Sequence, residues 1–490
     1  MTTLIEGGAV YDGSGGPARE ADVLLHGGVV ARVAPRLKER AAETINAKGA
    51  MVAPGLVDVA NYADHYNVLF EEATHTNFLA RGITSIVVGQ GGVSLPLTRT
   101  YAARLAAWWG RGMDTPSRSA TMRDFFSLLR RRIGVNVGTL VGHATVREEI
   151  LGGVSRDLTE GELKRMEAAI AAAVREGALG VSLNLGYPSV ARAPRREWHA
   201  AASAATRMGG IVAMRLRDRE TRLKEHLEEA FMLSEAVGAN LLITDLEPFA
   251  REDDAYRAIL ARITRGSADH NLHFATSGTG IAAVPLALFF PEHLREPSWS
   301  RMAERLTNPA IREEVRAHLA RYRGISFRIG AIADPSLKLL EGTSFSNWSL
   351  HEHISFEDAL IYLMAVSGLR GVLVGEMGDV SLARAFARHD RVVLASGDAA
   401  APSLGPPTYA TLLFEKNNEA FPFEQRVARM AAVPAAKLGL ARRGMVREGY
   451  RADLVVIADG AVRDVWVNGI RAIEGGVPTG RCGGVALMRT

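Results

Sequence analysis

Short apolar runs alternate with helical patterns along most of this 490-residue chain. One helical segment, Thr159 to Arg175, begins with a capping Thr159, has Glu162 three positions later and repeats apolar residues at helical spacing. Such an alternation of strands and helices is the signature of a parallel α/β architecture. Eight candidate barrel strands are expected, and they end near Ala60, Gly91, His143, Asn184, Arg215, Asp245, Ser277 and Asp398.

The two ends of the chain share a different character. Residues 3–50 contain short strand-like runs separated by turn signals such as D-G-S-G-G at residues 12–16. The C-terminal region repeats this pattern, and A-D-V-L-L near the start is matched by A-D-L-V-V-I near the end. We therefore expect residues 1–53 and 441–490 to form one small β domain, which leaves residues 54–440 for the α/β domain.

Residues 281–355 interrupt the alternation of strands and helices. This stretch combines several aromatic residues with five prolines, at positions 285, 291, 297, 309 and 335. We interpret it as an insertion between the seventh and eighth strands. It is either a lid over the open end of the barrel or a packing excursion on its flank, and the sequence leaves both alternatives open.

Composition argues against several classes of protein. The net charge of +4 comes from 58 basic and 54 acidic residues, and because the basic residues are spread along the chain, no nucleic-acid partner is expected. No apolar run reaches the roughly 18 residues of a membrane span, and no signal-peptide pattern opens the sequence, so we expect no membrane partner and a cytoplasmic location. The single Cys482 excludes an internal disulfide. The phosphate-binding G-x-x-x-x-G-K-[ST] and nucleophile G-x-S-x-G motifs do not occur.

Several motifs, in order and at consistent spacing, carry a family resemblance. They are M-V-A-P-G-L-V-D-V at residues 51–59, G-I-T-S-I-V-V-G-Q-G-G at 82–92, V-G-H-A-T-V-R at 141–147, E-G-A-L-G-V-S at 176–182 followed by Tyr187-Pro188, and L-R-D at 216–218. Together they resemble the N-acyl-D-amino-acid deacylase (D-aminoacylase) branch of the amidohydrolase superfamily over nearly the full length of the chain. The resemblance implies a (β/α)8 TIM-like barrel with a small composite β-sandwich formed by both termini.

The departures from the family pattern fall on its metal-binding positions. The first barrel strand of the superfamily ends in His-x-His, and this chain has Ala60 and Tyr62 there. The family's strand-two Cys is Gly91, and its strand-five and strand-six His are Arg215 and Asp245. Its Ser-Asp-Gly on strand eight becomes S-G-D at residues 396–398. Since zinc favours imidazole, thiolate and carboxylate ligands, we expect no bound metal and no other cofactor.

The same positions supply the candidate site. His143, Asp245 and Asp398 are candidate acids or bases, since active sites of such barrels lie at the C-terminal ends of the strands. Arg215 is expected to approach Asp245, either only to fill the vacated volume or to bind an anionic ligand.

Tyr187, Arg217 and the run at residues 351–353 are further positions that could bind a ligand or a metal. Tyr187 and Arg217 match family positions near the substrate. A buried core histidine is the alternative for His143. The H-E-H run at residues 351–353 lies outside any barrel-strand end, so it does not define a metal site.

Three functions remain open at this stage. The first is a metal-independent enzyme acting on an acyl, amide or carboxylate-bearing small molecule. The second is a non-catalytic homologue that binds a ligand or serves as a structural subunit beside an active enzyme. The third is a metal-dependent N-acyl-amino-acid deacylase with atypical ligands. The expected partner is a small molecule with a carboxylate or acyl group, and a homo-oligomer or a hetero-complex is compatible with the sequence.

Overall fold

The structure is a computed structural model of the whole chain. It describes residues 2–65, 68–95, 121–130, 133–152, 154, 156–186, 190, 193–218, 222–247, 254, 256–259, 261, 271–296, 298–332, 334–397, 408–415 and 421–489. Two of the predicted site residues, Tyr187 and Asp398, lie outside the described residues.

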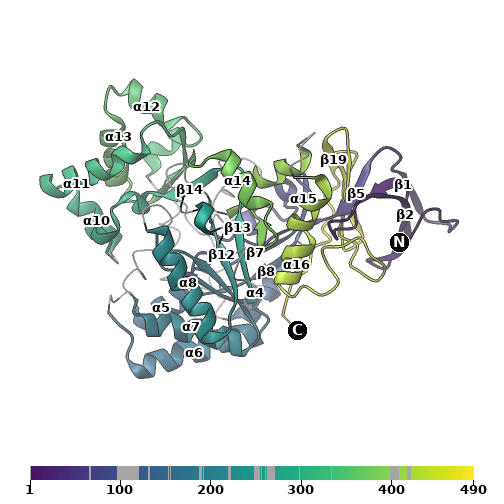
Figure 1. Cartoon of the computed structure of the whole chain (residues 1–490), viewed down its shortest axis with the longest axis horizontal. Coiled ribbons are helices and arrows are strands. Elements are labelled where there is room, and N and C mark those ends of the chain that lie inside the picture. The colour runs from purple at the N-terminus through teal and green to yellow at the C-terminus, as the bar shows by residue number, and fades with distance from the viewer. Residues whose placement is uncertain are drawn as a thin grey trace.

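Both ends of the chain join in one nine-stranded sheet, which lies at one end of the molecule (Figure 1). Its strands are β1 (Thr2–Val10), β2 (Arg19–His26), β3 (Val29–Ala34), β4 (Glu43–Asn46), β5 (Met51–Pro54), β18 (Leu454–Ala458), β19 (Ala461–Val467), β20 (Ile470–Glu474) and β21 (Val477–Pro478). The order is β21-β20-β19-β18-β5-β1-β2-β3, with β4 paired to β1. Antiparallel pairing of β18 with β5 connects the two ends, so the similar sequence patterns of both termini are explained by a shared sheet.

Two parallel sheets form the centre of the molecule. The three-stranded sheet contains β6 (Leu56–Asp58), β7 (Ile83–Val88) and β8 (Asn136–Thr139), in that order. The six-stranded sheet contains β9 (Val141–Gly142), β10 (Gly180–Asn184), β11 (Ile211–Arg215), β12 (Asn240–Thr244), β13 (Leu272–Thr276) and β17 (Val392–Leu394), in chain order from one edge to the other. Apart from the first residue of β12 and one residue of β13, these strands are buried along their whole length, as expected when helices cover a parallel sheet.

The eight predicted strands are therefore present, with the third divided into β8 and β9 around Leu140. The expected closed barrel is not detected in the described strand pairings, which leave the two sheets separate. Side chains bridge one of the open edges, because the backbone N–H of Ser396, after β17, donates to Asp58 Oδ1 at the end of β6 over 3.0 Å. The fold shown by these pairings is a mixed α/β architecture.

Helices connect the central strands. They include α1 (Val68–Glu71), α2 (Thr76–Leu79), α4 (Met122–Leu129), α5 (His143–Leu151), α6 (Glu160–Arg175), α7 (Arg195–Arg207), α8 (Leu223–Val237), α14 (Val380–Ala387), α15 (Phe423–Met430) and α16 (Ala432–Lys437). The helix predicted at Thr159–Arg175 is confirmed, and Thr159 and Glu162 form a reciprocal capping box at its start. No helix among the described residues is long and apolar enough to cross a membrane.

The stretch that interrupts the alternation folds as a unit with its own core, at the upper left of Figure 1. Three antiparallel strands, β14 (Ile281–Pro285), β16 (Gly371–Glu376) and β15 (Phe327–Ile332), form its sheet in that order. Helices α10 (Trp299–Arg305), α11 (Pro309–Leu319), α12 (Phe345–His351) and α13 (Phe356–Val366) and the short 3-10 helices η1 (Leu286–Phe289), η2 (Glu292–Leu294), η3 (Ala320–Tyr322) and η4 (Pro335–Leu340) complete it. Because β16 supplies the central strand, this insertion unit continues past residue 355 to Met377.

Candidate active site

Three buried side chains meet where the parallel strands end. Tyr62 follows β6, Arg215 is the last residue of β11, and Asp245 comes directly after β12. The phenol of Tyr62 donates to Asp245 Oδ2 over 2.7 Å, and Arg215 Nη1 lies 3.8 Å from the same oxygen. The exposed fractions are 0% for Tyr62, 2% for Arg215 and 5% for Asp245. The expected approach of Arg215 to Asp245 is thus observed, and Tyr62 is a third member that the sequence did not suggest.

Backbone strain accompanies this cluster. Asp245 has a φ of 56°, in the left-handed region that side chains other than glycine rarely adopt. Such strain persists only where surrounding contacts hold the residue, and it is concentrated at functional sites. The hydrogen bond from Tyr62 and the charge of Arg215 are two contacts that hold Asp245 in place.

Of the two small residues at the family's other ligand positions, Gly91 makes room for Tyr62. A Cβ on Gly91 would lie 3.0 Å from Tyr62 Cε1 and 3.6 Å from Asn184 Nδ2, and the φ of Gly91 is 61°. Ala60 is fully buried and packs with apolar side chains of the neighbouring strands. Glycine at 91 therefore allows an aromatic ring to occupy the end of the sheet.

A buried carboxylate lies beneath the cluster, at the edge between β6 and β17. Asp58 accepts hydrogen bonds from Asn61 Nδ2 over 2.7 Å and from the Ser396 backbone N–H over 3.0 Å, and also one from Ser396 Oγ. Burial raises the pKa of Asp58, although these hydrogen bonds oppose the shift. This group fixes the chain after β17 against β6 and explains why Ser396 faces inward.

His143 belongs to a separate buried group. Its Nε2 lies 2.9 Å from Glu197 Oε1, and the same oxygen accepts a hydrogen bond from Arg147 Nε over 2.8 Å. Burial opposes ionisation of Glu197, but hydrogen bonds and charges from His143 and Arg147 outweigh it and lower the pKa of this carboxyl. An ionised Glu197 holds the proton of His143 on Nε2, so Nδ1 is the atom left to accept a proton.

Nδ1 of His143 is buried and has no hydrogen-bond partner in the described part of the chain. Sequence reasoning found His143 and missed Glu197, which lies in the first turn of α7, 54 positions further on. No local spacing rule joins these two residues, and only the packing of both α5 and α7 against β10 brings them together.

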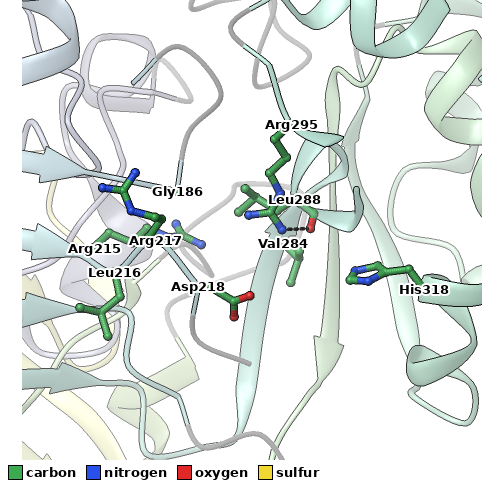
Figure 2. Close-up of a pocket in the computed structure, with 9 residues that line it drawn as sticks. All are labelled: Gly186, Arg215, Leu216, Arg217, Asp218, Val284, Leu288, Arg295 and His318. Carbon is green, nitrogen blue, oxygen red and sulfur yellow. Dashed lines mark hydrogen bonds between the residues drawn. The ribbon is translucent and has the colours of Figure 1, made fainter. Parts of the chain in front are cut away.

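Arg217 is placed beyond the end of β11, where its Nη2 donates to Glu229 Oε1 over 3.2 Å. With Arg215 it lines a small cavity between the strand ends and the insertion unit, shown in Figure 2. Asp245, another of the candidate acids or bases, contacts Tyr62 and Arg215, whereas His143 contacts Glu197. The candidate residues therefore fall into two clusters and not into one.

Among the described residues, no group of three or more His, Cys, Asp or Glu side chains is placed to hold a metal ion. His351 is at the exposed end of α12 with 86% of its side chain accessible, so the H-E-H run is a surface feature. The absence of a cofactor stays a prediction, since Asp398 is outside the described residues.

Comparison with known proteins finds relatives that this chain matches over nearly its full length. No family model matches the chain. An N-acyl-D-aspartate deacylase from Alcaligenes xylosoxydans xylosoxydans is 27% identical, over 96% of this chain and 92% of that protein. A D-aminoacylase from the same organism is 25% identical, over 99% of this chain and 97% of its own length.

Solved structures agree with the sequence relatives. A crystal structure of D-aminoacylase matches with a TM-score of 0.82 at 24% identity and 99% coverage of both chains. The N-acyl-D-glutamate deacylase of Bordetella bronchiseptica, solved with zinc and a phosphonate inhibitor, matches with a TM-score of 0.78 at 23% identity, again over 99% of both chains. The fold is thus that of the D-aminoacylase structure. The full-length relatives confirm the resemblance of this chain to D-aminoacylase and N-acyl-D-aspartate deacylase.

Proposed function

We propose that this protein is an enzyme of the amidohydrolase fold that acts, without a metal, on a small molecule carrying an acyl or amide group and a carboxylate. The observation that carries the proposal is the Tyr62–Asp245–Arg215 cluster at the strand ends. The relatives' names support the ligand class, since they describe deacylases of N-acyl-D-aspartate and other N-acyl-D-amino acids. The two parallel sheets would form the barrel, bridged by Asp58 and Ser396.

The donors at this position do not fit the zinc of the related deacylases. Tyr62 is a neutral phenol, which zinc does not favour as a ligand. Its hydroxyl donates to Asp245 Oδ2, so this carboxylate oxygen already accepts a hydrogen bond from the protein. A guanidinium 3.8 Å from the carboxylate already supplies a positive charge, and a dication beside it would be repelled. Ala60 and Gly91, at two further positions where the family carries metal ligands, offer no side-chain donor.

Each cluster has a chemical role in the proposal. Arg215, fixed by Asp245, is the cation that binds and orients the ligand's carboxylate. His143, oriented by Glu197, is the general base, and its Nδ1 takes the proton of the attacking water as the oxygen adds to the acyl carbon. The leaving amine regains that proton from His143 when the C–N bond breaks. Asp398 is proposed as a second acid–base group, and Tyr187 and Arg217 as further binding residues.

A second candidate function is a metal-dependent N-acyl-amino-acid deacylase with atypical ligands. The relatives favour it, because one related structure was solved with zinc and another is described as having a binuclear metal center. Its ligands would come from Asp64, His143, Asp245 and Asp398. Of these, Asp64 accepts a hydrogen bond from the backbone of Gly89 over 3.0 Å, and burial raises its pKa.

Elemental analysis combined with a deacylation assay separates these functions. The protein is stripped with a chelator, reloaded with zinc, and assayed on N-acyl-D-amino acids at each stage. The proposal expects less than one zinc per chain and turnover that survives the chelator. Tight binding of one zinc, with activity lost on chelation and regained on reloading, would instead establish the metal-dependent deacylase. Absence of turnover at every stage, with ligand binding retained, would identify a non-catalytic homologue.

A further inference from the structure

A cluster of basic side chains lies at the opposite end of the parallel strands from Asp245. Asp245 follows the last residue of β12, whereas this cluster surrounds the beginning of β13, which pairs in parallel with both β12 and β17. Its members come from β13, from the segment before β17, and from α15 and α16, and they are His273, His389, Arg391, Arg429 and Lys437. Four separate segments of the chain therefore converge in this basic cluster.

Backbone pairing and hydrogen bonds fix the positions of these segments. The N–H of Phe274 donates to the carbonyl oxygen of Arg391 over 2.9 Å, which places Arg391 beside the beginning of β13. Lys437 Nζ donates to the carbonyl oxygen of Asn271 over 2.8 Å and to Asn271 Oδ1 over 3.1 Å, so the last residue of α16 meets the residue before β13. Helix α15, which carries Arg429 in its last turn, packs against β17. The basic cluster is thus built into the fold.

The positive charges of the basic cluster are only partly compensated within the described part of the chain. Arg429 Nε is buried and has no hydrogen-bond partner there, and Asp390 is the carboxylate that acts on this guanidinium. Asp390 itself has 77% of its side chain exposed and lies 3.0 Å from His389 Nδ1. Lys437 is buried, and both groups that accept from its ammonium are neutral. Because cations withdrawn from water without an equal counter-charge are costly, the basic cluster favours an anion.

The repulsion among these cations alters their proton equilibria. Burial, with the charges of Lys437, Arg391 and Arg429, lowers the pKa of His273 to about 3, while Asp390 opposes the shift. The neutral His273 has a buried Nδ1 with no hydrogen-bond partner among the described residues. Burial, together with the charge of Arg391, lowers the pKa of Lys437 to about 7. Near neutral pH the basic cluster therefore presents two guanidinium groups, a neutral imidazole and a lysine that is only partly protonated.

We propose that the basic cluster is a binding site for a phosphate-type oxyanion, held by the guanidinium groups of Arg391 and Arg429, the ammonium of Lys437 and an N–H of His273. A tetrahedral oxyanion suits donors that converge from several segments, because its oxygens accept hydrogen bonds in several directions. Guanidinium groups match the geometry of phosphate oxygens, and a lysine adds a point charge. The phosphate group is either free or part of a small molecule such as a nucleotide. This site is separate from the proposed function, since it lies at the other end of the strands from Asp245.

Binding of the anion should be coupled to protonation of Lys437. A dianion beside the ammonium favours its charged form and raises the pKa of Lys437 towards the ordinary value of ~10.4. The other charged and titratable groups that act within the basic cluster are Arg391, Arg429, His273 and the His389–Asp390 pair. Since the guanidinium groups keep their charge near neutral pH, Lys437 is the group expected to take up the proton.

Binding measurements on the full chain test this site. Inorganic phosphate and adenosine monophosphate are titrated by isothermal calorimetry at neutral pH and constant ionic strength, with chloride as the balancing anion. Wild type should bind phosphate with millimolar or tighter affinity, and Arg429→Gln should weaken this binding by about tenfold or more, because it removes one of the converging charges. Tighter binding of adenosine monophosphate than of phosphate would identify the ligand as a nucleotide, whereas the reverse order would identify free phosphate.

Two further variants control for charge and for folding. Arg175→Gln is the matched control, since Arg175 also lies in the last turn of a helix, α6, which precedes β10 in another part of the sheet. It should leave the affinity for phosphate unchanged. Asp390→Asn should act in the opposite direction and strengthen binding severalfold, because it removes a carboxylate that opposes the anion. Thermal unfolding in chloride shows whether each variant is folded, and Arg429→Gln should not lower the unfolding temperature.

Sulfate tests the coupling to protonation, because its charge does not change near neutral pH, unlike that of phosphate. The heat of sulfate binding should depend on the ionisation enthalpy of the buffer, which reports the uptake of a proton. This dependence should disappear in Lys437→Met, while weak binding of sulfate through the two arginines remains.

Three results would overturn parts or all of this assignment. Equal effects of phosphate, sulfate and chloride on wild type would show a general salt effect and no site. Equal phosphate affinities of wild type, Arg429→Gln and Asp390→Asn would place the bound anion elsewhere on the chain. Proton uptake that persists in Lys437→Met would remove Lys437 from the site.

Discussion

The hydroxyl of Tyr62 donates to Asp245 across 183 positions of sequence, so that the end of β6 is tied to the end of β12. Arg215, on the strand next to Asp245, lies 3.8 Å from the same carboxylate oxygen. A phenol and a guanidinium therefore share one buried carboxylate at the ends of the parallel strands. This shared oxygen connects the ends of three strands, β6, β11 and β12.

Replacing Asp245 should reveal how the cluster is balanced. Asp245→Ala leaves Arg215 buried without its carboxylate and should lower the free energy of unfolding by about 3–5 kcal/mol. Asp245→Asn should cost less, because the amide can still accept from Tyr62 and asparagine tolerates a positive φ. Urea unfolding of both variants measures the difference. Equal losses would show that the charge of Asp245 does not hold Arg215.

Gly91 should be required by the ring of Tyr62 as well as by its own backbone. Gly91→Ala introduces a left-handed alanine, at about 1–2 kcal/mol, and a Cβ only 3.0 Å from Tyr62 Cε1. Gly238→Ala is the control, since Gly238 has a φ of 62° and open space around its position. We expect Gly91→Ala to lose about 1 kcal/mol or more beyond Gly238→Ala, measured by chemical denaturation. Similar losses would indicate that Tyr62 moves aside freely.

Glu197 should stabilise the fold in a pH-dependent way. Its pKa is lowered in the folded protein, so its contribution is present above the unfolded value, near ~4.3, and is lost as the pH falls through the folded value. Glu197→Gln removes this contribution. The stability difference between wild type and Glu197→Gln should therefore be larger at pH 7 than in the acid range, as measured by urea unfolding at each pH.

The same variant tests the catalytic role of His143. Loss of activity in a Glu197→Gln protein that folds normally would be expected if Glu197 fixes the proton on Nε2 of His143. A proton-linked NMR signal of His143 that is unchanged by the substitution would contradict that role.

Lys437 should make the stability of the protein depend on pH, which an exposed lysine with an unshifted pKa does not. The residue is only 4% exposed, and its Nζ donates to the carbonyl oxygen of Asn271 over 2.8 Å and to Asn271 Oδ1 over 3.1 Å. Burial, with the charge of Arg391, lowers the pKa of Lys437 to about 7. Between about pH 7 and the unfolded value near ~10.4, the unfolded chain binds the proton that the folded chain has released.

The stability of wild type relative to Lys437→Met should consequently rise with pH through this window, by at most about 1.4 kcal/mol per pH unit. Below pH ~7, where Lys437 is charged in both the folded and the unfolded protein, this relative stability should be at its lowest and independent of pH. Unfolding of both proteins at several pH values measures this slope. A flat difference from pH 7 to 10 would show that Lys437 remains charged inside the fold.

The sequence by itself determined the local elements and part of the site. Apolar runs bounded by turns placed the eight strands, and the Thr159–Glu162 capping box placed α6, because these features depend on residues close together in the chain. It also determined that Arg215 and Asp245 would meet, since both follow adjacent parallel strands whose C-terminal ends share one edge.

The tertiary structure alone decided the partners that come from distant elements. Glu197 reaches His143 only because α5 and α7 both pack against β10, and Tyr62 reaches Asp245 because Gly91 leaves space for its ring. Arg295 and His318 face the strand ends because the insertion unit folds around its own core and presents η1, η2 and α11 to them. Sequence spacing fixes which side chains share a helix or a strand end, whereas contacts between elements depend on packing and burial, which no local pattern encodes.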